Sequence, residues 1–139
     1  MPGRLAQTFL DLMAMRLPSV ALRHEPGPPL TFLVPAKHLE VGDLRVYDSG
    51  DELIIDFGNL THSHFAPYYH QHLPEEERLT EAATAAVEYV GDVLSDNRVV
   101  RVVFRDGVWS AATIFPRAAY VASSRQVGEK DFVWSGPLT

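Results

Sequence analysis

Hydrophobic residues recur at helical spacing in two segments of the chain. The first stripe runs from Leu5 to Leu17, and Pro18 ends it because proline cannot continue a helix. The second follows Pro74 and extends to Leu94, with three glutamates in its first turn, where carboxylates face the positive end of the helix dipole. The pattern predicts two amphipathic helices, each of which buries one face against another layer of the fold.

Two pairs of alternating or β-branched segments predict hairpins. Residues 44–47 and 53–57 flank a short polar link that contains a glycine. Residues 99–104 and 108–115 flank the turn dipeptide Asp106-Gly107. In the second pair, one face of the first strand is apolar throughout, which is typical of a sheet with one face under a helix.

The remaining segments are expected to be extended or irregular. Residues 23–29 contain too much proline for a helix or a central strand, so we expect a stiff connector there. Further strands are expected at residues 30–34, 60–65, 120–124 and 131–134.

The order of these elements predicts an α+β fold, in which two helices pack on an antiparallel β-sheet of about five to six strands. A chain of 139 residues has the ordinary size of one domain. We therefore expect a single α+β domain over residues 1–139, in which residues 1–29 form the N-terminal helix and the proline-rich connector.

The composition is typical of a globular protein and includes no cysteine. Disulfides, thiolate catalysis and cysteine-ligated zinc are therefore excluded. No apolar run approaches the roughly 20 residues that span a bilayer. Gln7, Asp11 and Arg16 interrupt the N-terminal apolar stretch, so we expect a mature helix there rather than a signal peptide. We expect a cytoplasmic protein that does not bind membranes.

Acidic residues gather in the middle of the chain. Residues 40–96 carry thirteen of them against two arginines, within a net charge of −6. Such a segment disfavours nucleic acid and favours a basic protein partner. The far face of the second helix supplies the candidate binding residues Glu77, Glu81, Glu88 and Asp92. The alternative is a solvated acidic surface that only keeps the protein soluble.

Four of the six histidines fall within eleven residues: His62, His64, His70 and His72. In an extended backbone, residues two apart share a face, so each pair can present two imidazoles to zinc or a similar metal. Residues 75–77 add glutamates that can complete the coordination or orient the imidazoles. The spacing matches no complete metalloenzyme signature, and structural or protein-contact roles for these histidines stay open.

Other residue patterns in the sequence give weaker evidence of function. Glycine-rich nucleotide-binding loops and the hydrolase G-x-S-x-G elbow are absent from the sequence. Aromatic residues near the C-terminus, Trp109 and Trp134 among them, stand among arginines. This combination is typical either of a binding face or of core rings flanked by solvated arginines.

The segment His62-Ser63-His64-Phe65, preceded by the apolar stretch 53–57, resembles small bacterial proteins in which a strand leads into an H-x-H-F motif. Some of these proteins are classed with the immunity proteins of polymorphic toxin systems. The resemblance covers about residues 44–65 and has a fainter counterpart in Trp134-Ser135-Gly136. It implies an antidote that binds a cognate toxin, with His62, His64 and Phe65 as binding residues.

The sequence thus favours a non-enzymatic protein-binding domain, immunity-like, with a basic bacterial protein as its partner and no cofactor. The alternative is a metal-binding protein or metal-dependent hydrolase that holds zinc through His62, His64, His70 and His72. A homodimer formed through an exposed sheet edge is a third reading.

Overall fold

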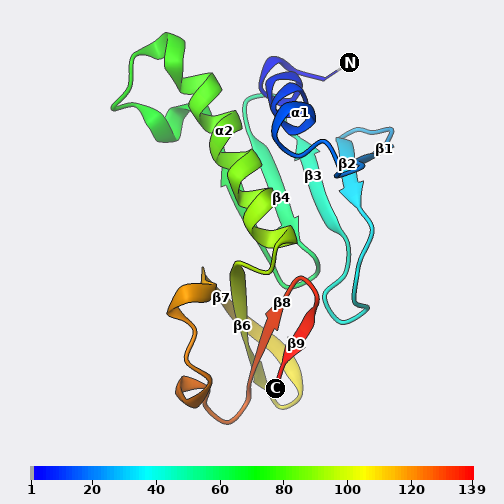
Figure 1. Cartoon of the computed structure of the whole chain (residues 1–139), viewed down its shortest axis with the longest axis vertical. Coiled ribbons are helices and arrows are strands. Elements are labelled where there is room, and N and C mark those ends of the chain that lie inside the picture. Colours follow the sequence, from blue (N-terminus) through cyan, green and yellow to red (C-terminus); the bar gives the residue numbers. More distant parts are fainter. Residues whose placement is uncertain (1) are drawn as a thin grey trace.

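The computed structural model describes residues 2–139 and contains two helices and two antiparallel sheets (Figure 1). The elements are α1 (Arg4–Arg16), β1 (Arg23–Glu25), β2 (Leu30–Val34), β3 (Leu44–Asp48), β4 (Leu53–Phe57), β5 (Thr61–Phe65), α2 (Glu75–Leu94), β6 (Arg98–Arg105), β7 (Val108–Pro116), β8 (Glu129–Val133) and β9 (Gly136–Leu138). Three short 3-10 helices join them: η1 (Pro67–His70), η2 (Arg117–Ala119) and η3 (Ala122–Ser124).

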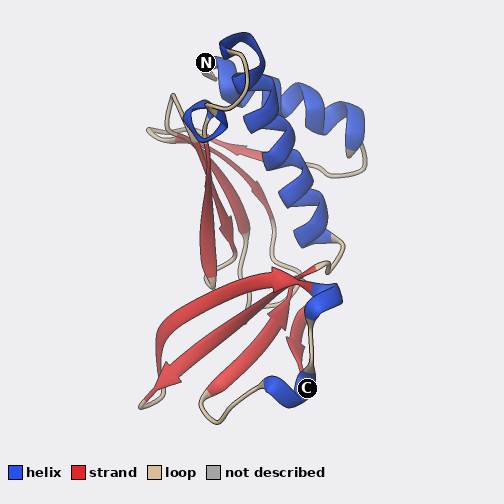
Figure 2. Ribbon diagram, turned by 90° about the vertical axis from the view of Figure 1, so that its left-hand side faces the viewer, coloured by secondary structure: helices blue, strands red, loops and turns tan. Residues whose placement is uncertain are grey.

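The first sheet is a meander in the order β1-β2-β3-β4-β5, and both helices lie on the same side of it (Figure 2). Alternation in β4 buries Leu53, Ile55 and Phe57 on the helix side, while the residues between them stay half-exposed. On α2, Ala83 and Ala86 are completely buried. Their small side chains allow the helix backbone to approach its neighbours closely.

The second sheet has the order β7-β6-β8-β9 and lies beyond the C-terminal end of α2 (Figure 1). Val100 and Val102 of β6, with Phe132 and Trp134, join the same hydrophobic cluster as the residues beneath the helices. One continuous core therefore links the two sheets.

A buried ion pair joins two strands of the second sheet. Asp131 on β8 is 1% exposed and accepts two hydrogen bonds from Arg101 on β6, at 2.7 and 3.1 Å. The hydrogen bonding to Asp131 raises the pKa of Arg101. Arg101 also donates to Ser124 at 3.0 Å, which ties η3 to the same face of the sheet.

The α+β class, the two helices and both hairpins are confirmed, while the strands divide between two sheets rather than forming one. Residues 23–25 were expected to belong to the proline-rich connector. They instead form a three-residue edge strand, because β2 provides an antiparallel partner. Residues 120–124, expected as a strand, instead include η3. The β9 strand at residues 136–138 was not predicted, since three residues with a central proline carry no alternation.

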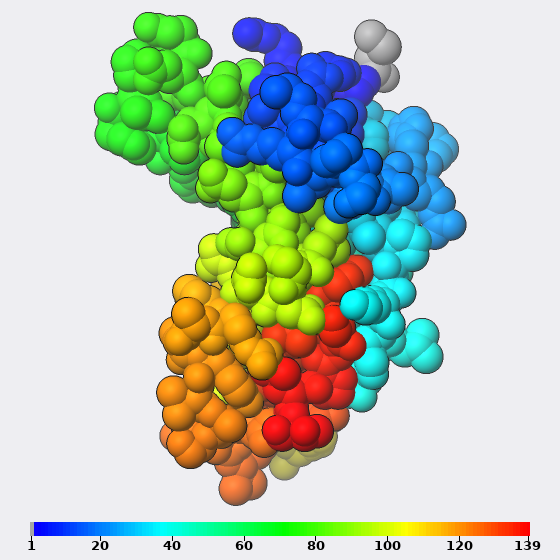
Figure 3. Space-filling model, viewed as in Figure 1, coloured from blue at the N-terminus to red at the C-terminus, as the bar shows by residue number. Residues whose placement is uncertain are grey.

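The space-filling view shows the segment around η1 and the start of α2 projecting from the body of the molecule (green, upper left of Figure 3). Among the helices within residues 2–139, none combines the length and hydropathy needed to cross a bilayer. The candidate site lies beside this projecting segment.

Candidate functional site

The β5 strand presents two of the predicted histidines together. His62 and His64 are exposed on the face of the first sheet that points away from the helices, and their ring centroids lie 5.1 Å apart. The side chain of Phe65 points to the opposite face of the sheet and packs against Tyr89 of α2, with the two ring centroids 5.3 Å apart. Of the four residues in the H-x-H-F segment, only the two histidines are therefore exposed.

A polar network connects His64 to the projecting segment. The Nδ1 atom of His64 lies 3.3 Å from Oε1 of Glu52, and the Tyr68 hydroxyl donates to Oε2 of the same glutamate at 2.9 Å. The Tyr69 hydroxyl lies 3.3 Å from that of Tyr68. These hydrogen bonds, to Tyr69 and to Glu52, raise the pKa of Tyr68. The network holds two tyrosines, 48% and 54% exposed, beside β5.

The second pair of histidines lies in a different backbone environment. His70 ends η1 and His72 lies in the following turn, so neither is on an extended strand. Their ring centroids are 6.0 Å apart. Across residues 2–139, no group of three or more histidine, aspartate or glutamate side chains is arranged to hold a metal ion.

The predicted acidic residues of α2 share one exposed side of the helix, and two of them already have cationic partners. Glu88 lies 3.8 Å from Arg16 of α1, and Asp92 lies 3.3 Å from Arg98 of β6. Glu77 and Glu81, nearer the start of the helix, have no ion-pair partner within the described part of the chain. The unneutralised charge therefore concentrates at the N-terminal half of α2.

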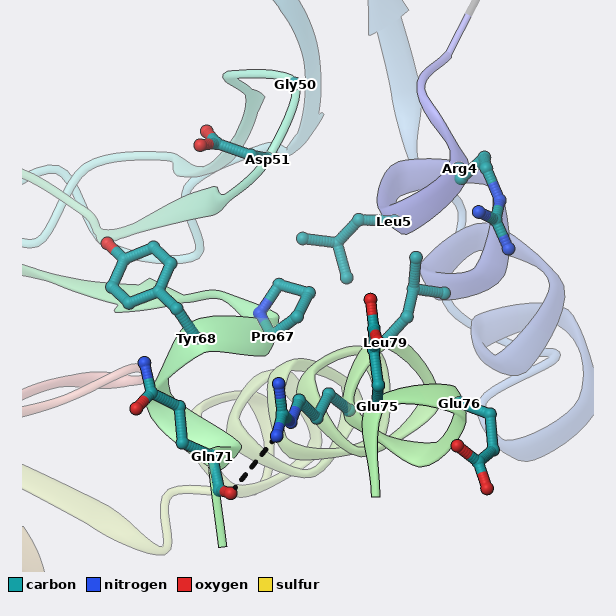
Figure 4. A pocket seen from close by; sticks show the side chains of 11 residues that line it. Arg4, Leu5, Gly50, Asp51, Pro67, Tyr68, Gln71, Glu75, Glu76 and Leu79 are labelled. Carbon is teal, nitrogen blue, oxygen red and sulfur yellow. Dashed lines mark hydrogen bonds between the residues drawn. The ribbon is translucent and has the colours of Figure 1, made fainter. Parts of the chain in front are cut away.

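An open cavity of about 710 Å³ lies at this same end, between α1, the β3–β4 loop, η1 and the start of α2. Figure 4 shows Leu5, Pro67 and Leu79 gathered at its centre, with Tyr68 at one side. Asp51 lines the cavity from the β3–β4 loop, on the same side as Tyr68. The cavity therefore combines an apolar floor with an aromatic and acidic rim.

Two glutamates add to the rim of this cavity. Glu75 points toward its centre, and Glu76 lies at its outer side (Figure 4). Like Asp51, neither has an ion-pair partner among residues 2–139. Arg4 lies across the cavity from Tyr68.

The remaining arginine of the cavity has a structural role. Arg78 donates from Nε to the backbone oxygen of Leu73 at 3.0 Å, and from Nη2 to that of Gln71 at 3.3 Å (dashed line in Figure 4 for Gln71). These bonds fix the loop that leads from η1 into α2. The guanidinium is thus oriented toward carbonyl groups of its own chain.

Sequence reasoning missed the cavity although it had singled out most of its surroundings. Asp51 was interpreted as part of a hairpin link, and residues 75–77 as a helix start or as additional metal ligands. Nothing in their spacing indicates that they meet, because they come from elements that only the fold brings together.

The aromatic residues near the C-terminus divide between core and surface. Phe132 and Trp134 are buried, whereas Trp109 is 48% exposed on β7. Trp109 and His62 line a second, smaller cavity of about 420 Å³ between the two sheets. The interpretation as core rings is therefore confirmed for Phe132 and Trp134, whereas Trp109 lies at the surface.

Comparison with known proteins gives no relative: the chain matches no family model, no curated protein sequence and no solved structure.

Proposed function

We propose that this chain is a non-enzymatic protein-binding domain that captures a basic segment of a partner protein in the cavity at the start of α2. The observation that supports this most directly is the lining of the cavity. Asp51, Glu75 and Glu76 line it without ion-pair partners among residues 2–139. Carboxylates left unpaired around a concave surface favour a cationic ligand.

The apolar floor fits the same class of ligand. Lysine and arginine bury their methylene stems against apolar surface while the charged head stays near water. Leu5 and Leu79 supply such a surface, and the exposed ring of Tyr68 offers a face on which a cation can rest. Tyrosine is also among the residue types that contribute most to binding energy at protein interfaces.

The resemblance to immunity proteins agrees with this location. Its strand and H-x-H-F segment form β4 and β5, and His64 is hydrogen-bonded to Glu52, which also binds Tyr68 of the cavity. A basic bacterial toxin that contacts the cavity would therefore also meet the exposed histidines. In this proposal, Glu77 and Glu81 extend the acidic surface beyond the rim.

The proposal is tested with a fluorescein-labelled peptide of repeated Arg-Ala-Lys, whose binding is followed by fluorescence anisotropy. The variant Asp51→Asn/Glu75→Gln/Glu76→Gln is expected to bind roughly three- to a hundredfold more weakly, since each of the three exposed ion pairs contributes about 0.2–1 kcal/mol. Wild-type binding is expected to weaken as salt increases, because ions screen surface charges.

The matched control removes the same number of carboxylates elsewhere. Asp11→Asn/Glu25→Gln/Glu40→Gln has the same net charge as the cavity variant but leaves the cavity intact. It is expected to bind the peptide as the wild type does. If both triple variants weaken binding equally, only net charge attracts the peptide and the cavity is not the site; absence of wild-type binding would also reject the proposal.

Zinc binding by the histidines is the second candidate, suggested by the pair His62 and His64, whose ring centroids lie 5.1 Å apart. It requires stoichiometric zinc in the purified protein and a melting temperature that rises when zinc is added. Both effects should disappear in His62→Ala/His64→Ala. A wild-type melting temperature that does not respond to zinc would remove this alternative.

A further inference from the structure

The two sheets have four edge strands, and three of them are at most five residues long. The β1 strand is three residues long and includes Arg23 and Glu25. The β9 strand is equally short, contains Pro137, and its Leu138 carbonyl accepts a hydrogen bond from Arg125 at 2.9 Å. The β5 strand has five residues, two of which are histidines. Short length, charge and proline are the usual protections of sheet edges.

The β7 strand is the exception. It has nine residues, Val108–Pro116, none of which is charged, and six of the nine are exposed. Val108 is 67% and Trp109 48% exposed. Apart from the ladder to β6, no hydrogen bond to its backbone is found within residues 2–139. A long, uncharged and unpaired edge strand favours the addition of another strand.

One section of this edge is regular enough to form a ladder. The pairing of β6 with β7 is irregular between Val103 and Phe104, near the hairpin turn. From Ala111 to Phe115 the register runs without a shift. Beside this section, Trp109 and Ala112 line a cavity of about 420 Å³ together with His62 and the β4–β5 turn.

We propose that two copies of this chain associate through β7, in an antiparallel pair centred on Thr113 across a two-fold axis. In this register Ala111 lies opposite Phe115 of the other copy and Ala112 opposite Ile114, so small residues face large ones. Thr113 lies opposite itself, and cross-strand threonine pairs are favourable. Alternation keeps each pair on one face of the extended sheet.

Charge supports a second copy as the occupant. The protein has a net charge of −6, which opposes self-association in general. The absence of charge along β7 removes like-charge repulsion where two copies meet. In the register centred on Thr113, the nearest charged residues along the chain, Arg105, Asp106 and Arg117, all lie outside the paired section 111–115. The contact is self-complementary, as a two-fold interface requires.

Sedimentation velocity over a range of protein concentrations tests this inference. The wild type is expected to shift from the mass of one chain to that of two. Thr113→Lys places two like charges opposite each other at the axis, and the dissociation constant should increase about a hundredfold, since such a juxtaposition costs several kcal/mol. Val127→Lys, at an exposed turn position away from β7, adds the same charge and should leave dimerisation unchanged.

A mixing experiment makes the test independent of any loss of folding. Thr113→Glu also places like charges at the axis. Within one chain, residue 113 lies opposite Arg101 on β6, and this arginine should stabilise a glutamate at position 113. Each variant alone should be monomeric, and an equal mixture of Thr113→Lys and Thr113→Glu should restore the dimer. A monomeric wild type, or a Thr113→Lys variant that dimerises as the wild type does, would overturn the inference.

Discussion

Tyr89 shows how one buried polar atom affects the behaviour of the whole chain. The residue lies on the inner side of α2 against Phe65, and its hydroxyl has no hydrogen-bond partner among residues 2–139. Burial raises the pKa of Tyr89 because the phenolate is disfavoured away from water, and the nearby Ser63 hydroxyl opposes this shift to a smaller extent. Burial and the hydrogen bond to Asp56, at 2.8 Å, likewise raise the pKa of Tyr47.

We predict that Tyr89→Phe is as stable as the wild type at pH 7, or more stable by up to about 1 kcal/mol, because it removes a buried group without a partner. Because the folded-state pKa lies above the ordinary tyrosine value of about 10, the unfolded state loses this proton first, so the native state loses stability as the pH rises from about 10 through the folded-state pKa. The decline in the free energy of unfolding above pH 10 should therefore be shallower in Tyr89→Phe. Urea denaturation at several pH values measures this.

Tyr47→Phe is the control. It removes a hydroxyl that donates to Asp56, so the variant should lose about 1 kcal/mol at pH 7. A loss of the same size in Tyr89→Phe would mean that its hydroxyl does have a partner, and the interpretation of the buried group would be wrong.

At the scale of elements, the junction between α2 and the second sheet depends on Asp96. This residue follows the helix with φ of +61°, a conformation that non-glycine residues rarely adopt. Its carboxylate accepts hydrogen bonds from the backbone nitrogen of Ser135, at 3.0 Å, and from the hydroxyl of the same residue. One side chain therefore ends the helix and fixes the β8–β9 turn beneath it.

Three substitutions at Asp96 separate these two roles. Asp96→Asn keeps an acceptor and tolerates the left-handed conformation, so we expect a loss below about 1 kcal/mol. Asp96→Gly removes the hydrogen bonds but still allows the left-handed backbone conformation, so the free energy of unfolding should fall by about 1–2 kcal/mol. Asp96→Ala loses the bonds and also strains the backbone, which adds about 1 kcal/mol. Urea denaturation should rank them in this order; an alanine variant as stable as the asparagine one would contradict it.

At the scale of the whole molecule, the continuous core predicts that both sheets unfold together. The two tryptophans, Trp109 and Trp134, report on the second sheet and its turn, whereas both helices cover the first. Tryptophan fluorescence and far-UV circular dichroism should therefore give coincident urea transitions, as one cooperative unit does. Two separate midpoints would show that the sheets are independent domains, contrary to the expectation of a single domain.

Local patterns were sufficient for the elements but not for the site. Helical periodicity gave α1 and α2 to within a residue at most of their ends, and turn residues gave both hairpins, because these signals act between near neighbours in the chain. The candidate cavity requires Asp51 and Glu75 to meet around Leu5, residues from three separate elements. The predicted acidic face of α2 is only partly unpaired, since Arg16 and Arg98 form ion pairs with its C-terminal carboxylates.

The sequence by itself determined the helices, most of the strands and the α+β class, since hydrophobic period and turn chemistry are local properties. The tertiary structure decided that the strands divide into two sheets, that β7 keeps a free edge, and that carboxylates surround a cavity. These features depend on contacts between residues far apart in the sequence, such as Arg101 of β6 and Asp131 of β8. Such contacts leave no trace in the hydrophobic period, because that period relates only near neighbours in the chain.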